Sequence, residues 1–146
     1  MAAGVLCAAG RVLAGRRRAT DRHPLAWELP GGKLEIGEDP RAALVRELRE
    51  ELDVAATVGR VLHRVGHRYD DRFIHITFLE VTAIDRAPAN RVFAELRWIP
   101  VEELEAVDFL AADRDFIAAL RARAIVPRSV RGSRRDGGRW LDVRDD

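Results

Sequence analysis

Three glutamates in one short segment are the residues of this chain whose types and spacing could carry out chemistry. Glu47 lies three residues before Glu50 and four before Glu51, so on a helix the three carboxylates share one side. Proteins hold Mg²⁺ or Mn²⁺ with a few such hard oxygens together with the phosphate oxygens of a substrate. Arg46 comes directly before them and can pair with Glu38 or brace the loop in front. The segment therefore predicts a site that holds divalent cations against a phosphate chain.

A turn at Pro30-Gly31-Gly32 precedes the acidic segment and is the second part of the predicted site. Neither glycine has a Cβ, so the backbone there can approach a ligand closely, and a free carbonyl could coordinate a metal. Lys33, the only lysine of the chain, follows at once. The competing interpretation is a solvated acidic helix face with Glu–Arg pairs. Short acidic fragments alone favour that interpretation, whereas the complete spacing behind the turn favours a functional site.

The element that must position the glutamates is a helix from about residue 40 to Leu52. Asp39 is a plausible N-cap, and Pro40 stands in the first turn, where proline is tolerated. Apolar residues recur at helical spacing and predict the side of this helix that faces the core. These residues are Leu44, Val45, Leu48 and Leu52. The glutamates then lie at the edge of the core, beside that stripe.

Other apolar runs predict the remaining elements. Strands are expected at residues 3–7, 11–15, 27–29, 55–66 (irregular in the middle), 73–82 and 92–99. A short helical turn is expected at 100–104, and a last amphipathic helix at 113–124 with Phe116, Ile117 and Leu120 inward. Strands punctuated by two helices predict an α/β or α+β sandwich.

The bulk composition bounds the class of protein. The 146 residues are 47% hydrophobic and 34% charged with a net charge of +1, which predicts one globular domain with no general attraction to nucleic acid or membrane. A single cysteine, Cys7, excludes an internal disulfide, and neither a signal peptide nor a spanning segment is evident, so we expect a cytoplasmic protein. The composition shifts at Pro127, which predicts a domain over 1–126 and an Arg/Asp/Gly-rich tail over 127–146. The tail is either mobile or docked, with residues 140–143 as an edge strand.

The segment from Gly32 to Val54 resembles the Nudix box: glycine, five residues, Glu, seven residues, Arg-Glu-apolar-x-Glu-Glu-x-Gly-apolar. The one departure is Asp53 in place of the usual glycine, at a helix end where a left-handed conformation is expected; Asp tolerates it better than most residues. With VLAGRRR and WELPGGKLEIGE in front, residues 4–122 are similar to the MutT-type branch. The resemblance implies an α/β fold, the Nudix α/β/α sandwich with a mixed sheet between helices.

The resemblance also implies roles for individual residues. The implied metal ligands are Gly31, Gly32, Glu47, Glu50 and Glu51, and the implied cofactor is Mg²⁺, with Mn²⁺ as a substitute. The implied catalytic residues are the same three glutamates and Arg46, with Glu47 foremost for orienting or deprotonating the attacking water. Lys33 would contact phosphate, and Arg17 would lie near the nucleotide. A late acidic ligand of some relatives falls here on Val92, which leaves the number of metals open.

Base recognition is expected to involve Asp113, at a position where MutT has an asparagine facing the base. An ionised carboxylate accepts hydrogen bonds and so favours a base with an exocyclic amino group. The alternative is that Asp113 only caps the last helix. Arg72 and His75 lie in a region that contacts the base in relatives, although a structural role is also open for each.

The function expected from this resemblance is an Mg²⁺-dependent nucleoside triphosphate pyrophosphohydrolase that releases the monophosphate and pyrophosphate. Its first expected substrate is CTP, dCTP or 5-methyl-dCTP, then 8-oxo-dGTP, then ADP-ribose or a dinucleoside polyphosphate. The rivals are a non-catalytic nucleotide-sensing Nudix module and a nucleic-acid-binding protein that uses the tail. We expect a monomer or homodimer with no stable nucleic-acid complex and no membrane partner.

Overall fold

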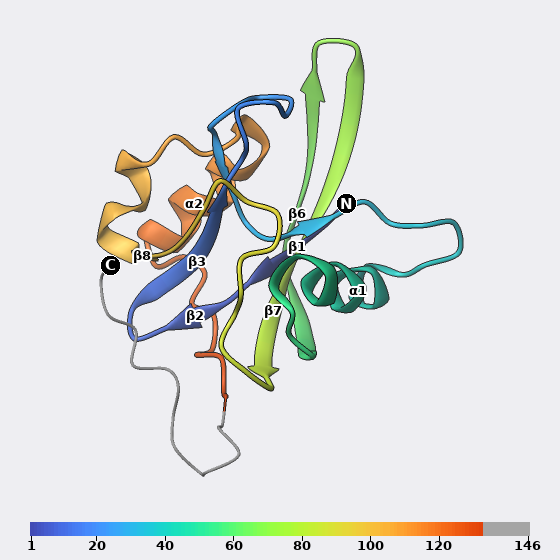
Figure 1. Ribbon diagram of the computed structural model, residues 1–146. Helices are drawn as coiled ribbons and strands as arrows, with labels where there is room; N and C mark the ends of the chain where they lie inside the picture. The colour runs from blue at the N-terminus through green and yellow to red at the C-terminus, as the bar shows by residue number, and fades with distance from the viewer. Residues whose placement is uncertain (133–146) are drawn as a thin grey trace.

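A computed structural model describes residues 1–132, which form two β-sheets and two α-helices (Figure 1). The first sheet has the order β5-β1-β7-β6, and β1 runs parallel to β7 while the other pairs are antiparallel, so the sheet is mixed. Its strands are β1 (Ala2–Val5), β5 (Gly31–Gly32), β6 (Ala56–Tyr69) and β7 (Arg72–Ile84). In the second sheet β3 pairs with each of the others; the strands are β2 (Cys7–Ala8), β3 (Arg11–Arg16), β4 (Trp27–Glu28) and β8 (Glu95–Pro100).

The first sheet is covered on both faces, as the alternating side chains of β7 require. Phe78 points to one side, where its ring stacks on Phe116 of α2 (Arg114–Arg121) with centroids 4.4 Å apart. Leu79 points to the other side, into the cluster formed by Leu44 and Leu48 of α1 (Pro40–Leu52). The predicted α/β sandwich with a mixed sheet between helices is confirmed. Two 3₁₀ helices, η1 (Val101–Ala106) and η2 (Ala111–Asp113), lead from β8 to α2.

Helix α1 begins and ends where the sequence predicts. The side chain of Asp39 accepts a hydrogen bond from the Ala42 N–H at 2.8 Å, and the helix ends at Leu52. Asp53 has the left-handed conformation expected there, with φ 55° and ψ 40°. Val45, however, is 40% exposed, so its assignment to the core was wrong. Because the helix also turns its glutamate side toward the protein, its buried arc is shifted and Val45 falls beyond the edge.

Strands β6 and β7 form a hairpin that is longer than predicted. It turns at Asp70 and Asp71, and its register shifts between Thr57 and His63, where the irregular middle was expected. Strand β7 pairs with β1 only from Thr77 onward, so the end of the hairpin projects beyond the body of the molecule (Figure 1).

Strand β8 starts later than predicted, at Glu95 rather than residue 92. The Asn90 side chain accepts from the Phe93 N–H at 2.8 Å and donates to the Phe93 carbonyl at 2.9 Å. These two hydrogen bonds hold residues 90–93 in a turn, and the Phe93 ring then packs in the space left by Gly15.

The described part of the predicted tail is docked. Val130 is 2% exposed, and its N–H donates to the Cys7 carbonyl at 2.7 Å. Arg131 pairs with β7, donating to Thr82 O and accepting from Ile84 N, each at 2.8 Å. The domain boundary at 126 stays a prediction, and the strand expected at 140–143 lies outside the described residues. No helix within residues 1–132 is long and apolar enough to cross a membrane.

Candidate active site

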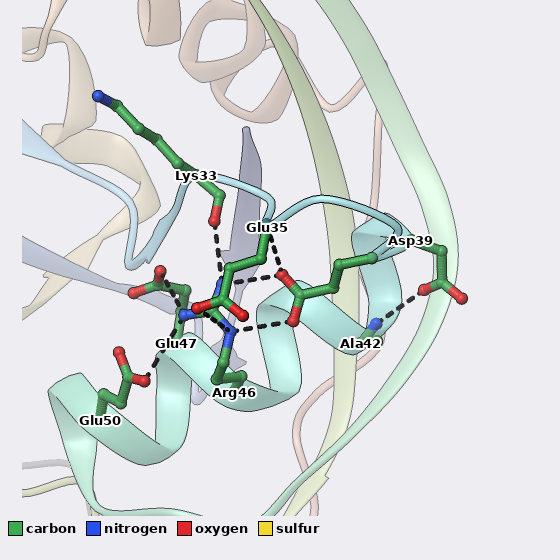
Figure 2. Close-up of polar contacts among 8 residues, drawn as sticks. Lys33, Glu35, Asp39, Ala42, Arg46, Glu47 and Glu50 are labelled. Carbon is green, nitrogen blue, oxygen red and sulfur yellow. Dashed lines mark hydrogen bonds and ion pairs between the residues drawn. The ribbon is translucent and has the colours of Figure 1, made fainter.

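The three glutamates of α1 lie where the helix packs against β5. Glu51 is 8% exposed and accepts a hydrogen bond from the Gly31 N–H at 3.0 Å. The Glu47 carboxylate lies against Gly32, and Glu50 is the most exposed of the three glutamates. Figure 2 shows Glu47 and Glu50 beside Arg46 on α1. The helix therefore presents a graded set of carboxylates, from buried to solvated, to the turn that precedes it.

The two glycines are needed for this packing. Gly31 has φ +150°, and a Cβ on it would lie 2.0 Å from the Ala2 carbonyl oxygen. A Cβ on Gly32 would lie 2.5 Å from the Glu47 carboxyl carbon. Any side chain at Gly32 would push Glu47 away, so the missing Cβ makes room for the glutamate; the predicted approach of this turn to a ligand stays a prediction.

Arg46 clamps the loop of residues 33–38 onto α1. Its Nε and Nη2 donate to the two oxygens of Glu38 at 2.9 and 2.8 Å, and Nη2 also donates to the Lys33 carbonyl at 3.0 Å (Figure 2). These bonds hold the pKa of Glu38 down at about 2. Arg46 Nη1 also donates to Glu47 at 3.0 Å. The predicted pairing with Glu38 and bracing of the loop are confirmed, whereas a catalytic role for Arg46 stays a prediction.

The charge balance around Glu51 is unfavourable without a cation. Burial, reinforced by the carboxylates of Glu47, Glu28 and Glu50, raises the pKa of Glu51 to about 8, against the opposing hydrogen bond from Gly31. A divalent cation would remove this repulsion, and oxygen ligands are those that Mg²⁺ and Mn²⁺ take. Within residues 1–132, however, no three acidic, histidine or cysteine side chains gather closely enough to form a metal cluster. The oxygen donors are therefore of the kind that a divalent cation takes, although in the described residues they are not gathered around one point.

A cavity opens beside the glycine turn. Gly31 and Gly32 line it together with residues of β1, β4, β6 and β7 and of the loops before β4 and α2. Among the lining residues are Arg17, Glu28, Tyr69, Arg72 and Asp113. The cavity therefore brings together residues that are far apart in the sequence, next to the glutamate helix.

Arg17 enters the cavity as an ion pair with Glu28. Its Nη1 lies 3.0 Å from Glu28 Oε2, and its Nε donates to the Arg22 carbonyl at 2.6 Å. Burial raises the pKa of Glu28, and Arg17 opposes that rise. Lys33, by contrast, is exposed and is not among the cavity-lining residues; its side chain extends away from the Arg46 clamp (Figure 2).

Asp113 is 3% exposed and lies at the wall of the cavity. Its Oδ2 accepts from the Leu29 N–H at 3.3 Å, and burial raises its pKa to about 7. Asp113 stands at the N-cap position of α2, as the capping alternative expected, but its side chain makes no capping hydrogen bond: η2 runs into the helix, and the carboxylate bonds the residue after β4.

Arg72 and His75 lie on opposite faces of β7. Arg72 lines the cavity, and its Nε is buried with no hydrogen-bond partner among residues 1–132. His75 is exposed on the other face, where its ring contacts Phe73 edge-on at 4.8 Å. The structure therefore brings Arg72 to the cavity and keeps His75 out of it.

The comparisons with known proteins agree with this geometry. A family model described as the NUDIX domain matches residues 1–120. The chain belongs to the Nudix family. The Nudix pyrophosphohydrolase predicted from the sequence is confirmed at the level of family and enzyme class, and members of this family generally need a divalent metal, usually Mg²⁺.

Two relatives of this Nudix chain carry names with different substrates. The 8-oxo-dGTP diphosphatase of Escherichia coli (strain K12) is 34% identical over 106 residues, 72% of this chain and 82% of that protein. The CTP pyrophosphohydrolase of the same strain is 34% identical over 113 residues, 77% of this chain and 84% of that protein. The solution structure of the E. coli ORF135 protein matches with a TM-score of 0.75 and 32% identity, covering 84% of this chain and 88% of that one.

Sequence reasoning missed two cavity residues of this Nudix enzyme. Glu28 is a lone acid between the buried Trp27 and Leu29, and that placement in front of the glycine turn was a signal. Tyr69 accepts a hydrogen bond from the Ala112 N–H at 2.8 Å through its hydroxyl, and its ring lies between those of His23 and His67, at 4.7 and 4.5 Å. No local pattern marks Tyr69, because only the hairpin's length brings it to the cavity.

Proposed function

We propose that this Nudix enzyme hydrolyses a nucleoside triphosphate to the monophosphate and pyrophosphate, with CTP, dCTP or 5-methyl-dCTP as the preferred substrate. One observation supports the choice of base: the same cavity is lined by the buried Asp113 carboxyl and by Arg72, whose Nε has no hydrogen-bond partner among residues 1–132. Buried polar groups are normally hydrogen-bonded, so an unused donor and a buried acceptor at a cavity wall point to a polar ligand.

Cytosine offers the complementary groups. Its N4 amino group donates, which suits the carboxylate of Asp113, and its ring nitrogen N3 and carbonyl O2 accept, which suits the guanidinium of Arg72. Glu28, the other carboxylate that lines the cavity, forms an ion pair with Arg17 and provides a second hydrogen-bond acceptor beside Asp113. A 5-methyl group adds only apolar surface and leaves the hydrogen-bonding edge unchanged.

The residues that would hold Mg²⁺, or Mn²⁺ in its place, are Glu47, Glu50 and Glu51 with the carbonyl of Gly31 or Gly32. When bound, the cation supplies positive charge beside the phosphate oxygens and lowers the pKa of a water molecule. Arg46 holds the Lys33 carbonyl, next to the glycine turn, and the Glu38 carboxylate against the helix, which supports the turn and the helix acting together as one site.

The chain's own groups account for the rest of the reaction. Glu47 accepts a proton from the attacking water molecule while the water oxygen forms a bond to the α phosphorus. The bond from that phosphorus to the α–β bridging oxygen breaks, and pyrophosphate leaves. Lys33, from an exposed position, and Arg17, from its half-buried ion pair with Glu28, supply positive charge toward the phosphate chain.

The test is a nucleotide panel with Mg²⁺, scored for both pyrophosphate and monophosphate. It contains CTP, dCTP, 5-methyl-dCTP, 8-oxo-dGTP, unmodified dGTP and ADP-ribose. We expect the highest kcat/KM on a cytosine nucleotide, and Asp113→Asn, which exchanges an acceptor for a mixed donor and acceptor, should reduce that preference about tenfold or more. A cytosine preference that survives Asp113→Asn would refute the proposed base contact. Glu51→Gln should abolish turnover on every substrate.

A second candidate is an 8-oxo-dGTP hydrolase. One observation favours it besides the names of relatives: burial raises the pKa of Asp113 to about 7, so near neutral pH the carboxyl is partly protonated and can donate as well as accept. An oxidised purine presents acceptors and donors side by side. If 8-oxo-dGTP exceeds every cytosine nucleotide in the panel, this second candidate replaces the first.

A further inference from the structure

The outer face of the β6–β7 hairpin carries an ordered surface that the proposed reaction does not use. In an antiparallel pair, directly opposed residues project from the same face. The three opposed pairs on this face are Arg64 with Thr77, Gly66 with His75, and Arg68 with Phe73. We call these six residues the hairpin platform. The opposite face of the same strands lines the cavity with Tyr69, Arg72, Ile74 and Ile76.

The platform stands clear of the body of the molecule. Strand β1 reaches β7 only at Thr77, so the hairpin toward its turn has no neighbouring strand in residues 1–132 (Figure 1). Arg64, Arg68 and His75 are exposed, and Phe73 is 54% exposed. A large ligand can therefore reach this face without displacing any described element.

Phe73 forms an aromatic surface in the middle of the platform. A Cβ on Gly66 would lie 2.7 Å from Phe73 Cζ and 3.0 Å from Cε1, so the ring lies across Gly66 and uses the space left by the missing side chain. The His75 ring meets it edge-on at 4.8 Å. Both contacts hold the ring in one place while one side of it stays open to solvent.

Arginines flank this ring on the neighbouring strand. Arg64 and Arg68 are four residues apart, which corresponds to about 13 Å along a strand. No platform residue carries a carboxylate; the nearest acids in the hairpin, Asp70 and Asp71, lie at its turn. The local charge is therefore positive although the net charge of the chain is only +1.

We propose that the hairpin platform binds single-stranded nucleic acid. Proteins that bind single strands without sequence preference combine cationic side chains along the backbone with exposed aromatic rings on which bases stack. The platform has both, with a ring between two arginines. A second copy of the same face would bring four arginines together and is disfavoured. This inference differs from the absence of a nucleic-acid complex expected from overall charge, because it rests on a local surface.

The experiment measures binding of a dye-labelled oligonucleotide of about 15 thymidines to the full chain by fluorescence anisotropy over a salt series. A single-stranded contact contributes a slope of about −0.7 per phosphate neutralised in a plot of log K against log salt. The double variant Arg64→Gln, Arg68→Gln should therefore flatten the slope by about 1.4. The matched control is Arg49→Gln, Arg121→Gln, which removes the same charge from exposed helix positions and should leave the slope unchanged.

The aromatic contact is tested separately at Phe73. Phe73→Leu keeps an apolar cover over Gly66 but has no ring, and should weaken binding about fivefold or more, since stacking of one base contributes at least that much. Phe73→Trp should retain affinity, and its added fluorescence, measured against the unmodified chain, should be quenched by the oligonucleotide.

Turnover of nucleoside triphosphates should be the same in all these variants, so the result is independent of the proposed function. The inference is overturned if the platform and control double variants bind with the same slope, or if Phe73→Leu binds as tightly as Phe73→Trp. It is equally overturned if the unmodified chain does not bind the oligonucleotide. Platform variants that then change the oligomeric state in size-exclusion chromatography would assign this face to a second copy of the chain.

Discussion

The buried environment of Asp113 disfavours the ionised form of its carboxyl group. Its pKa is raised from 3.8 to about 7, mainly by burial. Between those values the folded state binds more protons at this site than the unfolded state, so the free energy of unfolding falls as pH rises from about 4 to about 7. Above about pH 7 the free energy of unfolding has lost the whole contribution of this site. That loss is at most about 4 kcal/mol, which corresponds to a shift of roughly three pKa units.

Asp113→Asn removes this dependence while keeping an acceptor for the Leu29 N–H. We expect the variant to be more stable than the unmodified chain at pH 8 and close to it at pH 4, measured by thermal melting across that range. Asp115→Asn, an exposed position on the same helix, is the control and should not change the pH profile. A stability difference that is equal at pH 4 and pH 8 would contradict the raised pKa.

Arg46 helps to position the glutamates of α1 through its hydrogen bonds to Glu47 and Glu38. Its fork joins both oxygens of Glu38, and a lysine cannot reproduce that paired contact. Loss of an outer partner of metal ligands typically costs 10–100-fold in affinity. Arg46→Lys should therefore raise the Mg²⁺ concentration for half-maximal turnover by about that factor, while Arg49→Lys on the exposed side of α1 should leave it unchanged. Equal Mg²⁺ requirements in the two variants would count against the clamp.

At the scale of elements, the sequence predicted the features that depend on contacts within a few residues, such as the ends of α1. The cap at Asp39 and the left-handed Asp53 follow from backbone hydrogen bonds within a few residues, so both ends of α1 were predictable. Val45 was not, because which arc of a helix is buried depends on what lies against it, here the glycine turn. The placing of Glu28 and Tyr69 at one cavity depends on pairing between distant strands, which no single-sequence periodicity records.

The segment after residue 126 is a second element that composition did not decide: it left a mobile and a docked segment both open, and the described residues 127–132 are docked. Its arginines and glycines suggested a tail, yet one apolar residue, Val130, is buried in the cluster under α1, and the Arg128 N–H donates to the buried Glu80 at 2.8 Å. A single buried side chain and a few backbone hydrogen bonds suffice to dock a short segment, and average composition is insensitive to both.

Val130→Ala tests how much this docking stabilises the fold. Burying a valine side chain contributes about 2 kcal/mol, and we expect a loss of about that size in the free energy of unfolding from urea denaturation. Val126→Ala is the matched control, because Val126 is 63% exposed and its truncation should change stability by less than about 0.5 kcal/mol. Equal effects at the two positions would show that the segment does not contribute to folding.

At the scale of the whole molecule, the site is built where separately stabilised parts meet. Helix α1 brings the carboxylates, β5 brings the glycines, and the loop between them is fastened by Arg46. The cavity beside them is lined by residues of β1, β4, β6 and β7 and of the approach to α2. Each part is held by its own core contacts. The fold therefore keeps the glutamates close together although their charges repel one another. The folded chain should therefore gain stability when a cation relieves that repulsion.

Mg²⁺ binding to the native state alone stabilises it by RT ln(1 + [Mg²⁺]/Kd), about 2.7 kcal/mol at a hundred times Kd. For a chain of this length, that corresponds to a rise in Tm of roughly 5–10 °C. The rise should be absent in Glu51→Gln, whose neutral amide also removes the repulsion and should raise Tm in metal-free buffer above about pH 8, where the Glu51 carboxyl of the unmodified chain is charged. Matched NaCl controls separate this from general screening. If the metal-free variant melts no higher than the unmodified chain and both respond equally to Mg²⁺, then the buried carboxyl of Glu51 is neither the origin of the strain nor a ligand.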